Sequence, residues 1–391
     1  MDFRIALAVF FSLLNFGCAA LFVWQLRRRR DRLQVAVVAV WLWAIAMTGL
    51  VNLQILMPPE WQDFMRRWFY LPLAVEMVWN VLFLQFLFLG LLPTVLLLRR
   101  LRPVPLARPM SPHQISRRNF LYLASYGAAP TLALGMGVHG SLTRNELRVR
   151  EYNIGIAGLP PELEGFSIAH VSDLHSGIFV GPDRLKIVSQ AANDLKADLV
   201  AITGDMINGS MKEFPDALVA IQAIESRYGS YLCEGNHDIF PGPGLMVEAC
   251  AQNNLSMLYN TTRIVPVNGR RLILGGLPWF RRGFEVKPEV ANRLFPDRQE
   301  GDVRILLAHH PHLFDIAGSA DLVLTGHTHG GQIMLGDEVG LGPMFFRYWS
   351  GAYRRGNSTL IVSNGCGDWF PCRIGAPAEI GLLRLTSTGT T

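Results

Sequence analysis

Cysteine is scarce in this sequence, and no polar motif contains a cluster of it. The 391 residues hold five cysteines: Cys18, Cys233, Cys250, Cys366 and Cys372. A thiolate-ligated zinc or iron–sulfur site needs several cysteines close together, so no such site is expected. Cys366 and Cys372 flank a five-residue loop, Gly-Asp-Trp-Phe-Pro. In an oxidising compartment they could form a disulfide, and the sequence leaves both the disulfide and two free thiols open.

Internal repeats and low-complexity tracts are absent, and the second part of the chain has no excess of basic over acidic residues. Residues 1–147 hold 15 Lys and Arg against 6 Asp and Glu, whereas the remainder holds 21 against 25. The positive net charge therefore comes from the first part. Because binding to nucleic acid needs a basic surface, no nucleic-acid partner is expected for the second part.

Long apolar runs, by contrast, dominate the first 140 residues. Three of them contain at most one charged residue each: Phe3–Leu26, Leu33–Met57 and Trp68–Leu98. A shorter fourth run, Phe120–Gly140, has no charge but contains Pro130. About 20 apolar residues are enough to cross a bilayer. We therefore expect an α-helical transmembrane module over residues 1–146 and a water-soluble domain over 147–391, with buried core helices as the alternative for the runs.

Arginine clusters follow the first and the third apolar run, and they predict the orientation. Cytoplasmic loops carry the Lys and Arg excess, so the N-terminus is expected outside. The second cluster contains Ser116-Arg117-Arg118-Asn119-Phe120-Leu121, which resembles the twin-arginine export signal. No small-residue cleavage site follows it, so the fourth run would stay in the membrane. These features predict a multi-pass protein of the bacterial inner membrane with an extracytoplasmic C-terminal domain; with three spans that domain would be cytoplasmic.

Glu76 is the one charged residue of the third run. A carboxylate inside a bilayer is a candidate functional group. The position of Glu76, nine residues into a run of 31, favours a span that begins after it, which would place its side chain at the outer interface.

The second part of the chain carries five polar motifs, and each follows an apolar run typical of a buried strand. The runs are Phe166–Val171, Leu199–Thr203, Ser230–Cys233, Val303–Ala308 and Asp321–Thr325. The motifs are, in the same order, Asp173-x-His175, Gly204-Asp205, Gly235-Asn236-His237-Asp238, His309 and Gly326-His327-Thr328-His329. Short apolar runs closed by Gly, Asp or Asn indicate parallel or mixed central strands. Side chains that follow such strands meet at one edge of the sheet.

Helical periodicity separates the first three of these strands. It covers Pro182–Lys196 and Met211–Tyr228. Strands alternating with helices predict an α/β domain in which helices cover a sheet.

The motifs supply nitrogen and oxygen ligands for two metal ions that share a carboxylate. Two ions about 3.5–4 Å apart can activate a water and hold both the attacking and the leaving oxygen of a phosphate ester. Mixed imidazole, amide and carboxylate ligands suit manganese, iron or zinc. With water as the nucleophile, no covalent Ser or Cys is required.

From about Leu147 to Leu385 the chain resembles the calcineurin-like metallophosphoesterase family, whose fold is a four-layer αββα sandwich. The resemblance implies a first metal ion held by Asp173, His175 and His329. It implies a second ion held by Asn236, His309 and His327, with Asp205 bridging the two. No ligand position of the family pattern is missing or substituted.

The same resemblance implies two catalytic residues. His237 would lie beside the substrate, where it stabilises the phosphoryl oxygens or protonates the leaving group. Asp238 would orient the imidazole of His237, as carboxylates behind site histidines do. His310 competes with His309 for the ligand role, because alternation along a strand directs only one of them into the site, and the family pattern favours His309. His170, inside its strand, is predicted to be structural.

We expect a membrane-anchored, binuclear-metal phosphohydrolase. The expected reaction is that of a phosphodiesterase or pyrophosphatase acting on an envelope or lipid-linked phosphoester through a metal-bridging hydroxide. The segment Pro343–Arg355 is rich in aromatic residues and arginine, and it has two interpretations. Its aromatic residues could belong to the core and its arginines to the solvated surface. Alternatively, the segment forms a rim of the site, where the aromatic residues contact an apolar group and the arginines bind phosphate. The alternatives are a broad-specificity phosphomonoesterase and a catalytically silent membrane scaffold, and the complete ligand set argues against the scaffold.

Overall fold

The computed structural model describes residues 132, 134–279, 293–336 and 338–387. Contacts divide the chain into two units, and the second comprises Thr143–Trp369 and Arg373–Thr391. The three long apolar runs and the twin-arginine-like segment lie outside the described residues. Of the fourth run, residues 132 and 134–140 are described, and they are helical. No helix among the described residues combines the length and the hydropathy that a bilayer span requires.

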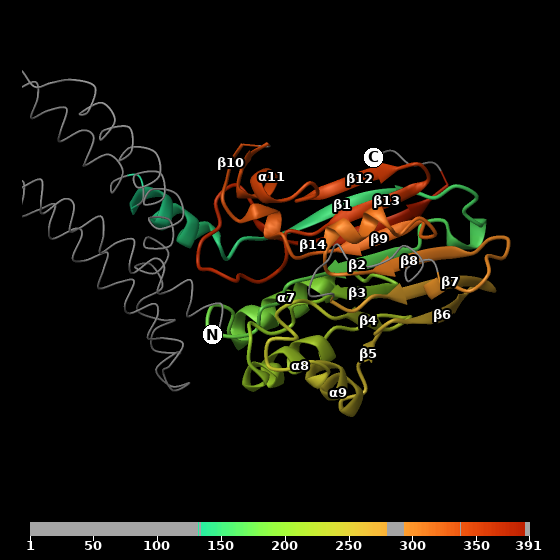
Figure 1. Ribbon diagram of the computed structural model, residues 1–391, viewed down its shortest axis with the longest axis horizontal. Coiled ribbons are helices and arrows are strands. Elements are labelled where there is room, and N and C mark those ends of the chain that lie inside the picture. The colour runs from blue at the N-terminus through green and yellow to red at the C-terminus, as the bar shows by residue number, and fades with distance from the viewer. Residues whose placement is uncertain (1–131, 133, 280–292, 337, 388–391) are drawn as a thin grey trace, which may run out of the picture. The chain divides into compact units, whose positions relative to one another are not determined.

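The second unit is built on two six-stranded sheets (Figure 1). The first contains, in spatial order, β1 (Leu147–Gly155), β14 (Ala378–Thr386), β2 (Ser167–Val171), β3 (Leu199–Thr203), β4 (Ser230–Cys233) and β5 (Ser256–Met257). From β2 to β5 the strands run parallel, and β14 is antiparallel to β2. All residues of β2 and β3 are buried. Such uninterrupted burial is typical of strands that are covered on both faces.

The second sheet contains β12 (Gly351–Arg355), β13 (Ser358–Val362), β9 (Leu322–Thr325), β8 (Val303–Leu307), β7 (Arg270–Gly276) and β6 (Thr261–Val267). The four strands β13, β9, β8 and β7 are parallel, and β12 and β6 are antiparallel edges. Asn268 and Gly269 form the two-residue turn of the β6–β7 hairpin. Both have positive φ, 50° and 83°, as hairpin turns of this length favour.

Three apolar cores hold the layers together. One lies between the sheets and joins residues such as Ile168 and Leu199 to Leu272 and Ile305. A second packs the outer face of the first sheet against α7 (Pro182–Asp194), α8 (Phe214–Gln222) and α9 (Leu245–Gln252). A third covers the outer face of the second sheet, where the 3-10 helix η6 (Pro311–Asp315) lies. The domain is thus an α/β sandwich, as the sequence predicts.

The helix expected over Met211–Tyr228 is shorter in the structure. Met211–Glu213 forms a 3-10 turn capped by Ser210, and α8 ends at Gln222. Beyond it, the backbone N–H of Glu225 donates to Asn193 Oδ1, so long-range contacts replace the helical ones. The five expected strands and the first helix lie within two residues of their predicted ends.

Cys366 and Cys372 are buried free thiols, so the open question of a disulfide between them is resolved in favour of thiols. The Sγ–H of Cys366 donates to the carbonyl of Glu379 at 3.1 Å. Burial raises the pKa of the Cys366 thiol to about 12.

Candidate metal centre

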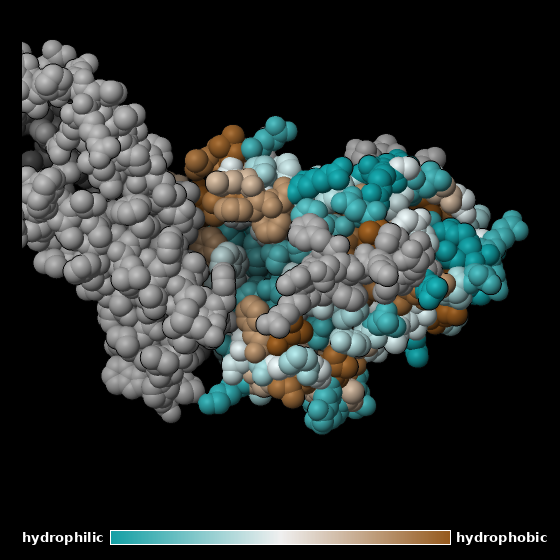
Figure 2. All heavy atoms as spheres, viewed as in Figure 1, coloured by the Kyte–Doolittle hydropathy of each residue, from teal (hydrophilic) through white to brown (hydrophobic). Residues whose placement is uncertain are grey.

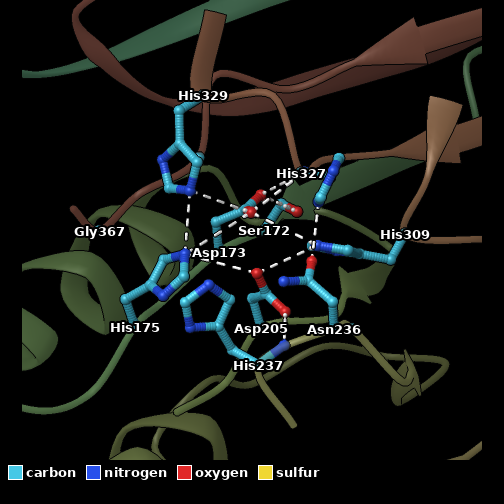
Figure 3. Close-up of polar contacts among 12 residues, drawn as sticks. Ser172, Asp173, His175, Asp205, Asn236, His237, His309, His327, His329 and Gly367 are labelled. Atoms are coloured by element: carbon cyan, nitrogen blue, oxygen red, sulfur yellow. Dashed lines mark hydrogen bonds and ion pairs between the residues drawn. The ribbon is translucent and has the colours of Figure 1, made fainter. Parts of the chain in front are cut away.

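The motif residues meet at the carboxyl ends of five strands, β2, β3 and β4 of one sheet and β8 and β9 of the other (Figure 3). Several occupy the left-handed backbone region that non-glycine residues avoid: Asp173, His175, Asp205, His327 and His329, with φ between 46° and 73°. Such strain costs about 1–3 kcal/mol per residue and clusters at functional sites. The chain therefore leaves each strand abruptly and directs these side chains to one place.

The first cluster of ligand atoms comes from Asp173, His175 and His329. The Nε2 atoms of the two histidines are 2.9 Å apart. Asp173 Oδ1 lies 3.3 Å from Nε2 of His329 and 3.9 Å from Nε2 of His175. All three side chains are buried, so one carboxylate oxygen and two imidazole nitrogens face a common point.

The second cluster comes from Asp205, His309 and His327. Asp205 Oδ2 lies 3.1 Å from His309 Nε2. Asn236 joins this cluster, because its Oδ1 is 2.8 Å from Nδ1 of His327. His309 Nδ1 contacts the carbonyl of Thr203 at 2.6 Å, which fixes the ring with Nε2 toward the carboxylate.

Asp205 lies between the clusters. The same Oδ2 that contacts His309 is 3.5 Å from Nε2 of His175. Its other oxygen accepts the backbone N–H of His237 at 2.8 Å. One carboxylate oxygen therefore faces both groups of ligands (Figure 3).

The donor set fits two divalent cations. Asp173 and Asp205 are 0% and 1% exposed, and buried carboxylates are costly without positive partners. Burial alone would raise the pKa of Asp205, but the imidazoles of His309 and His237 hold it well below its usual range. Burial would lower the pKa of His309, yet Asp205 outweighs it and raises that pKa to about 9. Cations bound by unprotonated imidazoles would balance the two carboxylates in the same way.

Of the adjacent pair, His309 and not His310 belongs to the cluster. His310 accepts the backbone N–H of His312 at its Nδ1. Its ring packs against that of His327, with centroids 4.8 Å apart and planes tilted by 33°. Trp279, which carries no motif signal in the sequence, lies 5.1 Å from the same His327 ring. These two rings pack beside the second cluster.

Asp238 does not have the expected environment. Its carboxylate accepts backbone N–H groups of Asp205, Met206 and Gly235 at 2.8–2.9 Å. The Nδ1 of His237 instead lies 2.8 Å from the carbonyl of Asn208. The prediction that Asp238 orients His237 is therefore wrong, because the backbone of the Gly204-Asp205 turn uses its oxygens. Asp238 holds the turn that presents Asp205.

His237 lies beside both clusters, and its ring meets that of His175 edge-on at 4.5 Å. Its ligand atoms also fall within a group formed with His175 and Asp205. Asn208 O can only accept, so Nδ1 of His237 carries the proton in that contact and a neutral ring has its lone pair on Nε2. The geometry thus allows His237 either beside a substrate or on a metal.

Arg373 is a site residue that no motif indicated. It is 1% exposed, the largest fully buried side chain described. Its guanidinium lies 3.2 Å from Nδ1 of His329, bonds to Asp368 Oδ1 at 2.5 Å and donates to the carbonyl of Gly367 at 2.6 Å. Arg373 therefore ties a metal-ligand candidate to the loop before β14.

Comparison with known proteins agrees with this site. A family profile described as calcineurin-like phosphoesterase matches residues 166–331. An uncharacterized metallophosphoesterase of Helicobacter pylori is 31% identical over 278 residues, which cover 69% of this chain and 71% of the relative. One from Bacillus subtilis is 28% identical, covering 70% of this chain and 99% of the relative.

A Danio rerio relative described as a transmembrane protein with metallophosphoesterase domain is 29% identical, over 60% of this chain and 56% of its own length. The profile match contains the six ligand candidates from Asp173 to His329 and the bridging candidate Asp205. The chain belongs to the calcineurin-like metallophosphoesterase family and is a metal-dependent phosphoester hydrolase.

Proposed function

We propose that the protein is a membrane-anchored phosphodiesterase or pyrophosphatase with two divalent ions, acting on an envelope or lipid-linked phosphoester. The observation that carries the proposal is the pair of ligand clusters that share Asp205 Oδ2. Asp173, His175 and His329 would hold one ion, and Asn236, His309 and His327 the other. The ligand types favour manganese, iron or zinc.

Bound ions would supply Lewis acidity and an activated water. The protein's own part is to position them through Asp205 and to handle a proton. With both ring nitrogens protonated, His237 would donate Nδ1–H to the Asn208 carbonyl and use Nε2–H to hold a phosphoryl oxygen or to protonate the leaving group. Asp238 would keep Asp205 in place through the backbone contacts already described.

The rim segment Pro343–Arg355 favours a diester over a monoester. Arg355 pairs with Asp315 at 3.0 Å, and Arg347 lies 3.7 Å from the same carboxylate. Tyr348 is buried in the core beneath. Asp315 thus offsets the charge of both arginines, which weakens their grip on the extra negative charge of a monoester. Phe346, 5.7 Å from the His327 ring, offers an apolar contact to a second ester group.

We expect the purified protein, loaded with Mn²⁺, to hydrolyse bis(p-nitrophenyl) phosphate with a kcat/KM at least about tenfold above that for p-nitrophenyl phosphate, the usual worth of one apolar contact. Nitrophenolate release measures both rates under the same conditions. A preference for the monoester would favour the broad-specificity phosphomonoesterase. Hydrolysis of neither ester by protein carrying two ions would favour the silent scaffold.

An exposed apolar surface supports a lipid-linked substrate. It comprises Leu335, Val339, Met344 and Phe345, which are 61–73% exposed. These residues belong to β10 (Met334–Gly336), β11 (Val339–Gly340) and α11 (Leu341–Phe345), directly after the His329 loop. Figure 2 shows apolar side chains gathered over β10 and α11. Exposed apolar side chains grouped in this way mark binding sites for apolar partners, here an acyl chain.

Replacing Met344 and Phe345 together by Ser should lower kcat/KM for a lipid pyrophosphate in vesicles by about tenfold or more, because two apolar side chains no longer leave water on binding. The rate for soluble bis(p-nitrophenyl) phosphate should stay unchanged. Val219→Ser is the matched control, because Val219 is 69% exposed on α8, which supplies no ligand. Equal rates of variant and wild type on both substrates would contradict the proposal that this surface binds a lipid, and would leave the proposed phosphodiesterase reaction unaffected.

The membrane assignment rests on the apolar runs of residues 1–146 and on the twin-arginine-like segment. The description of the Danio rerio relative as a transmembrane protein is in line with it. We expect the domain on the extracytoplasmic side of a bacterial inner membrane. Reporters that work on one side of the membrane, fused after Leu106 and after Thr391, should report cytoplasm and exterior respectively. Cytoplasm at both sites would contradict four spans.

A further inference from the structure

A chain of four buried polar side chains leads to the first metal cluster. His170 Nε2 lies 2.8 Å from Thr203 Oγ1. Thr203 Oγ1 donates to Ser172 Oγ at 2.7 Å, and Ser172 Oγ donates to Asp173 Oδ2 at 2.6 Å. All four residues are 0% exposed. Bulk water therefore cannot replace any of these hydrogen bonds.

The protons of this chain all point toward Asp173. The carboxylate can only accept, so the Ser172 hydroxyl donates to it. Thr203 has one hydroxyl proton and gives it to Ser172, so it must accept from Nε2–H of His170. Burial lowers the pKa of His170 to about 4, and a neutral ring has a single N–H. Its other nitrogen, Nδ1, has no hydrogen-bond partner among the described residues, so the ring's one hydrogen bond goes into the chain.

The two oxygens of Asp173 therefore have different partners. Oδ2 receives the Ser172 hydroxyl, whereas Oδ1 faces the imidazoles, 3.3 Å from Nε2 of His329. The backbone N–H of His327 lies 3.1–3.2 Å from both oxygens and does not distinguish them. A Cβ at Gly326 would lie 2.0 Å from Ser172 Oγ and 2.1 Å from Asp173 Oδ2. The absence of a side chain at Gly326 leaves room for the hydrogen bond from Ser172 Oγ to Asp173 Oδ2.

We propose that His170, Thr203 and Ser172 are positioning residues that fix Asp173 as a ligand through Oδ1 and so set the affinity of the first metal position. The inference rests on the metal assignment proposed above. Fixing a ligand in advance removes part of the entropy lost on binding, and changes behind a ligand cost about 10–100-fold in metal affinity. The second metal position touches these residues through backbone groups, since the Thr203 carbonyl contacts His309 Nδ1 and the His327 N–H donates to Asp173. Changes to the side-chain hydroxyls leave both backbone contacts in place, so the second position should keep its affinity.

A purely structural role is the competing explanation, since buried polar atoms need partners in any case. However, β2 and β3 already pair through their backbones, with His170 opposite Ala201 and Val171 opposite Ile202. The side-chain hydrogen bonds are additional to that pairing. A structural role predicts lower stability without a change in metal affinity.

Thr203→Val tests the two explanations, because it keeps the side chain's shape and removes the hydroxyl. Thr325→Val is the matched control. Both threonines are fully buried, end a strand and precede a glycine, but Thr325 Oγ1 donates to the Ile361 carbonyl instead. Thr203→Ser retains the hydroxyl and should behave as wild type. Thr203→Val leaves intact the backbone carbonyl that holds His309.

The full-length chain, stripped of metal, is titrated with Mn²⁺ by calorimetry. We expect wild type, Thr203→Ser and Thr325→Val each to bind two ions. At each of the two positions, the three proteins should have the same affinity. Thr203→Val should bind one ion as wild type does and the other about 10–100-fold more weakly. Ser172→Ala should give the same pattern. It replaces Thr203→Val in this experiment if that variant does not fold.

Wild-type affinity at both positions in Thr203→Val and Ser172→Ala would overturn the inference. So would an equal loss at both positions, or an equal loss in Thr325→Val. In each of these cases the proposed function would still hold if wild type binds two ions and hydrolyses the ester. Wild type binding fewer than two ions would instead overturn the metal assignment.

Discussion

Asp205→Asn should leave no measurable hydrolysis and should lower the metal affinity of both positions, each by more than about 100-fold. Changes to residues that only support a ligand lower metal affinity by up to about 100-fold, and loss of a shared ligand should exceed that. Oδ2 of Asp205 is 3.1 Å from His309 Nε2 and 3.5 Å from His175 Nε2, so one substitution affects both clusters. An amide also removes a buried negative charge that both cations would need. Metal analysis of the purified variant and its rate on bis(p-nitrophenyl) phosphate provide the measurements.

Asp302→Asn is the control for this substitution. Asp302 is also a buried aspartate, 6% exposed, but it accepts from Arg271 and from the backbone of Gln299, outside the site. It should keep both ions and the wild-type rate. An Asp205→Asn protein that retained two ions and near-normal turnover would refute the shared-carboxylate arrangement.

The sequence predicted the site's position because each ligand candidate lies two to four residues after the end of a short, mainly apolar strand. Asp205 follows β3, and His309 follows β8 by two residues. Strand ends of this kind depend on local composition, and parallel pairing then brings them to one edge. Local periodicity was also enough for α7. It failed at the end of α8, where Asn193, 32 residues away, captures the backbone of Glu225.

Contacts between distant residues were not predictable in this way. Asp238 adjoins His237 in sequence, which suggested a pair, yet its oxygens bind backbone groups 32 and 33 residues earlier. Arg373 carries a full charge, and arginine is seldom buried completely unless it is paired. Its partners Asp368 and the backbone carbonyls lie on a loop that no motif marks. Packing of loops against a sheet edge decides such contacts, and sequence periodicity carries no information about it.

His237→Ala should retain both ions and slow turnover by about 10²–10⁴-fold, the usual contribution of general acid–base catalysis. The Nδ1–H of the ring donates to the Asn208 carbonyl, so the proton for the leaving group comes from Nε2–H of the imidazolium form. The loss should be largest for esters with poor leaving groups and small for p-nitrophenyl esters, whose leaving group needs no protonation. Rates across a series of phenyl esters of rising leaving-group pKa measure this dependence.

Metal content separates this role from the alternative that the geometry also permits, in which His237 is a ligand with His175 and Asp205. His327→Ala is the reference for loss of a ligand, because its Nδ1 faces Asn236 Oδ1 in the second cluster. If His237 is an acid, its alanine variant keeps two ions while His327→Ala loses one. Loss of an ion from His237→Ala would make it a ligand. Two retained ions with a uniform rate loss across leaving groups would instead assign His237 to holding the phosphoryl oxygens, since that contact acts whatever group departs.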